Sequence, residues 1–141
     1  MNKSVLKLTI IGSIVFLLAS CSVKETVDDI DKKAIERWNA LIEGDYKKAY
    51  SYIAPSYKQL EDFSAFSNRM NVAQLHITWN KVELNNKKCE PEVCEVNLKL
   101  NYTYQFPKRS MGEATATTDV KENWIKSDEK WYYLPAEKKG I

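Results

Sequence analysis

Glycine, histidine and cysteine are scarce in this chain of 141 residues, and each shortage excludes a class of function. Four glycines leave no glycine-rich loop of the kind that cradles phosphate groups. One histidine, His76, and three cysteines are too few for the ligand sets typical of zinc sites, and no grouping suggests a nucleophilic triad. We therefore expect no metal ion, no cofactor and no catalytic residue set.

Long apolar runs are also missing, except at the N-terminus. Lys3 and Lys7 precede an apolar segment that runs from Leu8 to Leu18, and small residues then lead to Cys21. A basic start, an apolar middle and a small-residue end are typical of a cleaved secretion signal, and the run is shorter than the ~20 residues of a spanning helix. The alternatives are a retained transmembrane anchor and a secretion signal without lipid.

Leu18-Ala19-Ser20-Cys21 resembles the lipobox of bacterial lipoproteins. That resemblance implies that the Cys21 thiol receives a diacylglycerol and becomes the first residue of the mature chain. Ser22, rather than an aspartate, then implies export in a Gram-negative cell to the outer membrane, facing the periplasm. We accordingly divide the chain into a signal peptide (1–20), a lipidated cysteine with a short tether (21–28) and one domain (29–141).

The predicted mature chain has equal numbers of basic and acidic residues. Removal of residues 1–20 takes away Lys3 and Lys7, which leaves 121 residues with 19 basic and 19 acidic side chains. Without net charge or a basic block, nothing favours nucleic acid as a partner. A mature chain of this length suits a single domain.

Cys89 and Cys94 are the cysteines that remain beside Cys21. They bracket four residues, with Pro91 among them, which suits a hairpin loop whose neck a disulfide would close. The alternative is a metal or redox pair, but the spacing matches neither a zinc nor a thioredoxin pattern. In an exported chain we expect the disulfide.

The first part of the mature chain has the spacing of helices. Apolar side chains from Ala34 to Ile42 share one face of a predicted helix that ends at Gly44, with Arg37 among the residues predicted to face solvent. Asp45 is expected to cap a short second helix that stops before Pro55. A third helical region is predicted from there to about Met70.

The chain then changes to the alternation of strands. Leu75, Ile77 and Trp79 alternate with polar residues, and a phase slip at Asn80-Lys81 predicts a bulge. Residues 96–106 alternate without a break, and strands at 114–125 and 131–134 follow. Helices first and an antiparallel meander afterwards predict an α+β domain with helices packed on one sheet face.

The order helix, Gly44-Asp45-Tyr46, second helix, Pro55-Ser56-Tyr57 and a curved meander ending in Trp131-Tyr132 resembles the NTF2-like, or cystatin-like, α+β cone. That resemblance implies a curved sheet around the first helix and a cone-shaped pocket. The superfamily includes isomerases, dehydratases and hydrolases as well as binding modules without catalysis. Its domains often pair through the sheet, so a homodimer and a monomer both stay open.

The candidate pocket residues are mostly aromatic, and the alternative is that they fill a small core. Glu122 shares its strand phase with Val120 and Trp124, so a buried Glu122 could serve as a general base. We favour the interpretation that Glu122 reaches solvent or a lysine near the strand end, and that Arg69 is solvated. The candidate set comprises Trp38, Tyr50, Tyr57, Phe66, Trp79, Tyr102, Tyr104, Glu122 and Trp124.

Three functional hypotheses follow. The preferred one is a non-catalytic module that docks an envelope protein close to the membrane, because the tether is short. The second is a carrier of a small apolar or aromatic ligand in the cone. The third is a small-molecule isomerase or hydrolase that uses Glu122.

Overall fold

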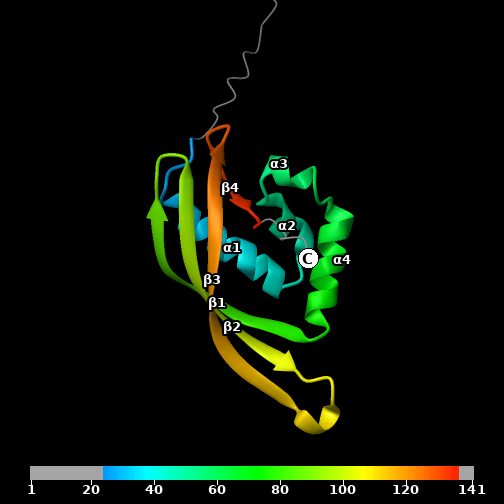
Figure 1. Cartoon of the computed structure of the whole chain (residues 1–141). Coiled ribbons are helices and arrows are strands. Elements are labelled where there is room, and N and C mark those ends of the chain that lie inside the picture. The colour runs from blue at the N-terminus through cyan, green and yellow to red at the C-terminus, as the bar shows by residue number, and fades with distance from the viewer. Residues whose placement is uncertain (1–23, 137–141) are drawn as a thin grey trace, which may run out of the picture.

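A computed structural model of the chain describes residues 24–136, so the predicted signal peptide and Cys21 lie outside the described residues. Four helices come first and an antiparallel sheet follows, which confirms the predicted α+β class (Figure 1). No helix within residues 24–136 is both long and apolar enough to cross a membrane. The elements are α1 (Asp29–Ile42), α2 (Tyr46–Ser51), α3 (Pro55–Lys58), α4 (Phe63–Gln74), β1 (Ile77–Cys89), β2 (Val93–Gln105), the 3-10 turn η1 (Arg109–Met111), β3 (Glu113–Ser127) and β4 (Lys130–Leu134).

Local signals set the ends of the helices. Gly44 follows α1 with a φ of 76°, a conformation that glycine adopts without strain, and the Asp45 side chain caps α2 by accepting from the Lys48 amide at 2.9 Å. The third helical region, predicted to end at about Met70, consists of two helices. Asp62 is extended and its carboxylate caps a new helix through the Ala65 amide at 2.8 Å, so α3 and α4 are separate and α4 runs to Gln74.

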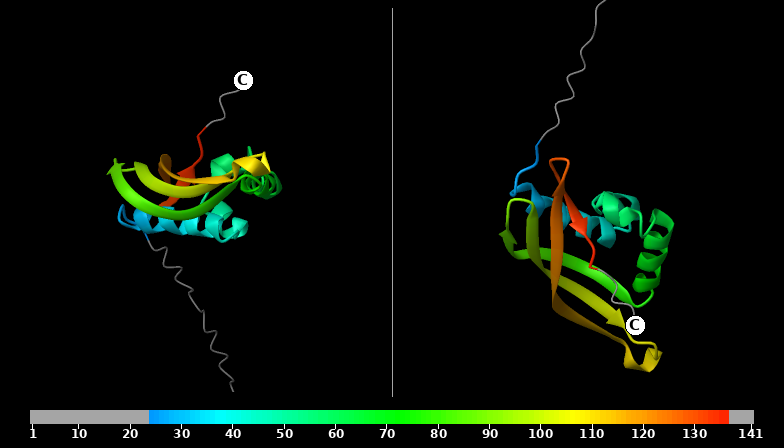
Figure 2. Two further views of the ribbon diagram at one scale, coloured as in Figure 1. Left: turned by 90° about the horizontal axis from the view of Figure 1, so that it is seen from below. Right: turned by 45° about the horizontal axis from the view of Figure 1, so that its top comes forward.

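The sheet is a meander with the strand order β1-β2-β3-β4. A register shift between Trp79 and Lys81 confirms the predicted bulge, and a second shift lies between Leu84 and Asn86. The expected strand start at Leu75 is wrong, because Leu75 caps α4 and is exposed. Figure 2 shows the strong curvature of the sheet, to which bulges contribute by bending and twisting a strand.

One face of the sheet carries the core. Helix α1 packs against β1 and β4, and α2 packs against α1 and α4. Along β2, the side chains of Cys94, Val96, Leu98 and Leu100 are buried on the helix side. The other face is polar: Asn80 Nδ2, for example, donates to both Asn101 and Thr103 at 3.0 Å. The alternation of apolar and polar residues in the sequence thus correctly predicts which side chains of β2 face the helices and which face away.

The sheet extends beyond the helices. Residues 113–119 of β3 are exposed on both faces, although they pair with β2 throughout. Figure 1 shows this half of the β2–β3 hairpin projecting past the helical layer. The projecting half therefore keeps one apolar face without a cover from the described part of the chain.

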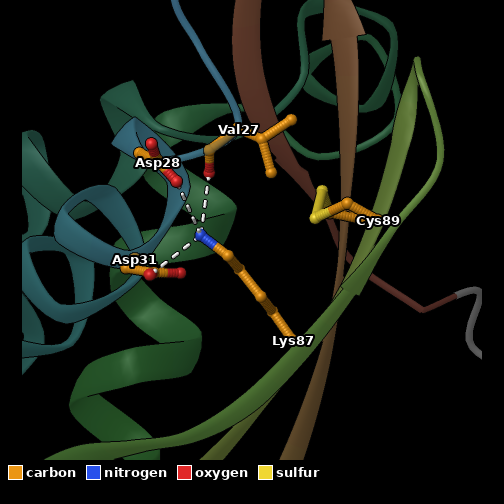
Figure 3. Close-up of a disulfide and its surroundings, with 6 residues drawn as sticks. Val27, Asp28, Asp31, Lys87 and Cys89 are labelled. Carbon is orange, nitrogen blue, oxygen red and sulfur yellow. Dashed lines mark hydrogen bonds and ion pairs between the residues drawn. A yellow bond between two sulfur atoms is a disulfide. The ribbon is translucent and has the colours of Figure 1, made fainter.

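Cys89 and Cys94 are brought to disulfide distance across the β1–β2 turn. They are register partners with Cα atoms 4.1 Å apart, and the two sulfurs are bonded. Cys94 is fully buried, so this link joins the core to the end of β1. Figure 3 shows Cys89 beside the segment that leads into α1.

Reduction of the disulfide is expected to lower the free energy of unfolding by ~2 kcal/mol, because the bond restricts only a short loop of the unfolded chain. Denaturant titration with and without reductant measures this loss. The variant C89A/C94A provides the control, since the same reductant should leave its midpoint unchanged. An unchanged midpoint in the native sequence would contradict a structural bond.

Candidate functional site

A cavity of about 440 Å³ lies between the helices and the sheet. Residues of α1, α3, α4, β1 and β4 contribute to its wall, as does the segment that follows β4. Most of the lining is apolar or aromatic, including Trp38, Leu41, Tyr57, Phe66, Met70 and Trp79. The cavity size is within the range of small-molecule sites, which is about 300–1,000 Å³.

The structure brings four of the nine candidate residues to this cavity, namely Trp38, Tyr57, Phe66 and Trp79. Trp38 and Trp79 meet edge to face with ring centroids 5.8 Å apart. Periodicity predicted Trp38, Phe66 and Trp79 on the apolar faces of their elements, and these faces converge on the space beside α1. Tyr57 was a candidate only because it is aromatic.

Tyr50 belongs to the packing around the helices rather than to the cavity wall. Its ring lies 5.5 Å from that of Phe63 and 5.3 Å from that of Phe66. Its hydroxyl donates to the Glu61 carbonyl at 2.9 Å. Trp124 is fully buried in the core.

Glu122 is the centre of a buried polar cluster. It is 1% exposed, and the expectation that it reaches solvent or a lysine is wrong. Arg37 and Trp38 of α1 donate to its Oε1 atom, Trp38 at 2.7 Å. Trp124, two residues along β3, donates to Oε2 at 3.0 Å. The carboxylate therefore meets a cation and one indole N–H group from α1, and a second indole N–H group from its own strand.

Arg37 is buried as well, which overturns its predicted place on the solvent face of α1. Its side chain is 5% exposed. The guanidinium carbon lies 4.0 Å from the ring centroid of Tyr133 and 5.2 Å from that of Trp38, so aromatic faces cover the cation on the cavity side. Arg37 thus supplies both the partner of Glu122 and part of the cavity wall.

This arrangement favours a structural role for Glu122. Both carboxylate oxygens already accept hydrogen bonds, and Glu122 is not among the described residues that line the cavity. A general base needs an oxygen within hydrogen-bond reach of the substrate proton that it removes. The geometry therefore gives Glu122 the features of a buried ion pair that positions α1 on β3.

Arg69 is the second cation in the cavity wall, and its side chain is 41% exposed, so it is partly solvated as predicted, but it also has a carboxylate partner that the sequence did not predict. From α4 it donates through Nε and Nη2 to the two carboxylate oxygens of Glu61, at 2.8 and 2.7 Å. These hydrogen bonds raise the pKa of Arg69 above its usual value. Both arginines of the wall are paired with carboxylates, so the cavity is electrically balanced.

Tyr133 adds a neutral polar group to the same wall. Burial raises the pKa of its phenol, so the hydroxyl stays protonated at neutral pH. Tyr57 contributes a second phenol. The lining thus combines apolar surface with neutral groups that can form hydrogen bonds.

A second apolar groove, also of about 440 Å³, lies on the projecting half of the sheet. Tyr102 and Tyr104 line this groove and not the cavity beside α1. Their register partners on β3 are Ala116 and Ala114, whose small side chains leave the groove open. Trp79 lines both spaces, so the single predicted pocket is in fact two adjacent ones.

Metal chemistry has no support among residues 24–136. No group of three or more histidine, cysteine, aspartate or glutamate side chains lies close enough together there to hold an ion. His76 is exposed, and Cys89 and Cys94 are bonded to each other.

Solved structures share this fold. A candidate NTF2-like transpeptidase from Campylobacter jejuni matches with a TM-score of 0.51 and 16% identity, over 79% of this chain and 100% of the other. A candidate dehydratase of the NTF2-like family from Streptomyces avermitilis matches with a TM-score of 0.52 and 8% identity, over 78% and 95%. The domain therefore has an NTF2-like fold.

A SEC-C motif containing protein from Rhodopseudomonas palustris also matches, with a TM-score of 0.55 and 12% identity over 72% of this chain and 71% of the other. No protein-family model matches the chain, and no curated protein does. Identities this low show a shared fold and carry no activity from one protein to another.

Proposed function

We propose that this chain is a lipid-anchored protein of the bacterial cell envelope whose NTF2-like domain binds a small, uncharged apolar or aromatic molecule in the cavity beside α1. The observation that carries the proposal is the cavity itself, about 440 Å³ with a largely aromatic lining. Its two cations are both paired with carboxylates, so the wall offers little net attraction for an anion. The two phenols supply polar contacts that orient a ligand.

The proposed location rests on the lipobox. A lipid on Cys21, outer-membrane retention and a periplasmic orientation all follow from that resemblance and from Ser22. Two or more acyl chains hold a protein firmly on a bilayer, whereas one chain binds reversibly. The domain would then sample ligands at the membrane surface.

Filling the cavity should abolish binding of a neutral fluorescent probe. We expect the neutral probe N-phenyl-1-naphthylamine to bind the native domain saturably. A small substitution in the cavity wall would leave most of the ligand volume free, so a large side chain is needed. Ala73 lines the cavity from α4, so the variant A73W places an indole in the ligand volume and should weaken probe binding at least ~10-fold. Fluorescence titration with matched protein concentrations measures the change.

The matched control fills the other space. Ala116 lines the groove on the projecting sheet, and A116W should leave probe affinity unchanged. Loss of binding in A116W with retention in A73W would place the ligand in the groove instead. Thermal unfolding of both variants confirms that each remains folded.

A second candidate function is docking of an envelope protein close to the membrane. The observation that favours it is the exposed groove with Tyr102, Tyr104 and Phe106 in its wall, since aromatic side chains are enriched at protein interfaces. Photo-crosslinking from position 116 in cells tests this function. A specific crosslinked envelope protein supports it, and its absence together with probe binding in the cavity favours the carrier.

A further inference from the structure

The described part of the chain begins at one end of the sheet (Figure 1), and Cys21, the proposed lipid site, precedes it by three residues. The β1–β2 and β3–β4 turns lie at this end with residue 24, and the β2–β3 connection lies at the opposite end (Figure 1). The β1–β2 turn contacts the end of β3, because the Lys126 amide donates to the Glu92 carbonyl at 2.8 Å. β2 runs from one end to the other over 13 residues, a contour of about 40 Å at ~3.3 Å per residue.

Glu25 fastens the start of the domain to this end. Its amide donates to the Glu129 carbonyl at 3.0 Å, so the backbone joins the β3–β4 turn. Its carboxylate accepts from the Trp131 amide and from Lys33 Nζ, both at 2.7 Å. Lys126 Nζ donates to the Glu25 carbonyl at 3.0 Å. Glu25 is thereby fixed to β4, to α1 and to the end of β3.

The next residues are fixed as well. Lys87 Nζ donates to the Val27 carbonyl at 3.1 Å and to Asp31 at 2.9 Å, and it lies 3.7 Å from Asp28 (Figure 3). Residues 25–28 of the predicted tether are therefore part of the folded domain. Cys21 precedes Lys24 by three residues, which reach at most about 11 Å at ~3.6 Å per residue.

We propose that the membrane faces the end of the domain that carries the β1–β2 and β3–β4 turns, with Glu25 holding the anchor there. This inference rests on the proposed lipid anchor at Cys21. A long free tether would let the domain turn in any direction, whereas a short one fixed by Glu25 restricts which end approaches the bilayer. The projecting β2–β3 end, with its apolar groove, then points away from the membrane toward partners in the aqueous phase.

Charge does not select this end. The side chains at and beside its turns carry both signs: Glu90, Glu92, Asp128 and Glu129 against Lys24, Lys126 and Lys130. The covalent anchor and the Glu25 contacts must therefore set the orientation. Salt screens surface charges, over about 10 Å at 0.1 M and about 3 Å at 1 M. An orientation that does not depend on surface charge should therefore persist at high salt.

Fluorescence quenching in nanodiscs tests the orientation of the full lipidated chain. A dye is attached at K130C, beside the β3–β4 turn, or at S110C, in η1 at the opposite end, and nitroxide-headgroup lipids serve as the quencher. Both positions are exposed. We expect several-fold stronger quenching at K130C than at S110C, at low and at high salt.

Two further variants test the part played by Glu25. E25A removes the side-chain contacts but keeps the backbone contacts of residue 25 and those of Lys87, so it should reduce the difference between the two quenching values. E43A removes an exposed acid after α1 and should leave the difference intact. A full difference in E25A would overturn the role of Glu25. Denaturation curves verify that both variants are folded.

The outcomes separate the two proposals. Equal or reversed quenching in a membrane-bound chain would overturn the orientation and leave the anchor standing. A chain that never enters nanodiscs or membranes with Cys21 intact would overturn the lipid anchor, and the orientation with it.

Discussion

The variant E122A is expected to lose about 3–5 kcal/mol of unfolding free energy, because removal of one partner leaves the Arg37 guanidinium buried without its countercharge. Arg37 is 4% exposed, so water cannot replace the carboxylate. Two buried indole N–H groups, of Trp38 and Trp124, lose their acceptor in the same step. A domain of this size has roughly 5–15 kcal/mol in total, so E122A should lose a large share of its unfolding free energy.

Denaturant titration of three variants separates the buried charge from other causes. D119A changes an exposed acid on the same strand and should stay within about 0.5 kcal/mol of the native value. R37M/E122A removes both charges and should be more stable than E122A alone, since no unpaired ion remains. A loss below ~1 kcal/mol in E122A would contradict the ion pair as a stabilising element.

The variant C21S should move the protein from the membrane fraction to the soluble fraction almost completely. Under the proposed lipidation, C21S removes the thiol that receives the acyl chains, and no helix among the described residues is long and apolar enough to cross a membrane. Each acyl CH₂ that enters the bilayer contributes about 0.8 kcal/mol, so the loss of two chains removes far more than any surface contact could restore. Fractionation of cells with immunodetection measures the shift.

S22A provides the control, because it changes the neighbouring residue and leaves the thiol. It should remain in the membrane fraction. Membrane association of C21S at the native level would contradict lipidation at this position and favour the retained apolar segment as the anchor.

The sequence predicted the elements whose signals are local. The alternation from Val96 onward, the phase slip at Asn80-Lys81 and the cysteines around Pro91 each concern neighbouring residues, and each is found in the structure. Asp62 was missed as a helix cap because the apolar spacing continued through it. Turn and cap chemistry can outweigh periodicity over a few residues.

The ion pair was missed because it joins residues 85 positions apart in the chain. Arg37 follows Ala34 by three residues and precedes Leu41 by four, which places it on the buried face of α1. Glu122 stands between Val120 and Trp124 in the apolar phase of β3. A charged residue on the apolar face of a helix and an opposite charge on the apolar face of a strand together indicate a buried ion pair. The local sequence of α1 and that of β3 do not show that these two elements pack against each other.

The single pocket predicted from the sequence corresponds to two separate spaces, the cavity beside α1 and the groove on the projecting sheet. Strand phase placed Tyr102 and Tyr104 on the same face as Leu98, and that placement agrees with the lining of the groove. Phase does not tell where along a strand the helices stop. Tyr102 and Tyr104 lie beyond them, so these residues line a separate groove instead of the cavity beside α1.

Native mass spectrometry of the lipid-free domain is the direct test of whether the cavity beside α1 holds a ligand. Residues 22–141, which lack the proposed lipid site, are purified and measured alongside the same chain with A73W, whose cavity is filled. The account predicts a small-molecule adduct on the native cavity that is released on denaturation and is missing from A73W. An apo mass for both proteins, together with no saturable binding of the neutral probe, would contradict a ligand-binding cavity and leave the groove as the candidate for protein docking.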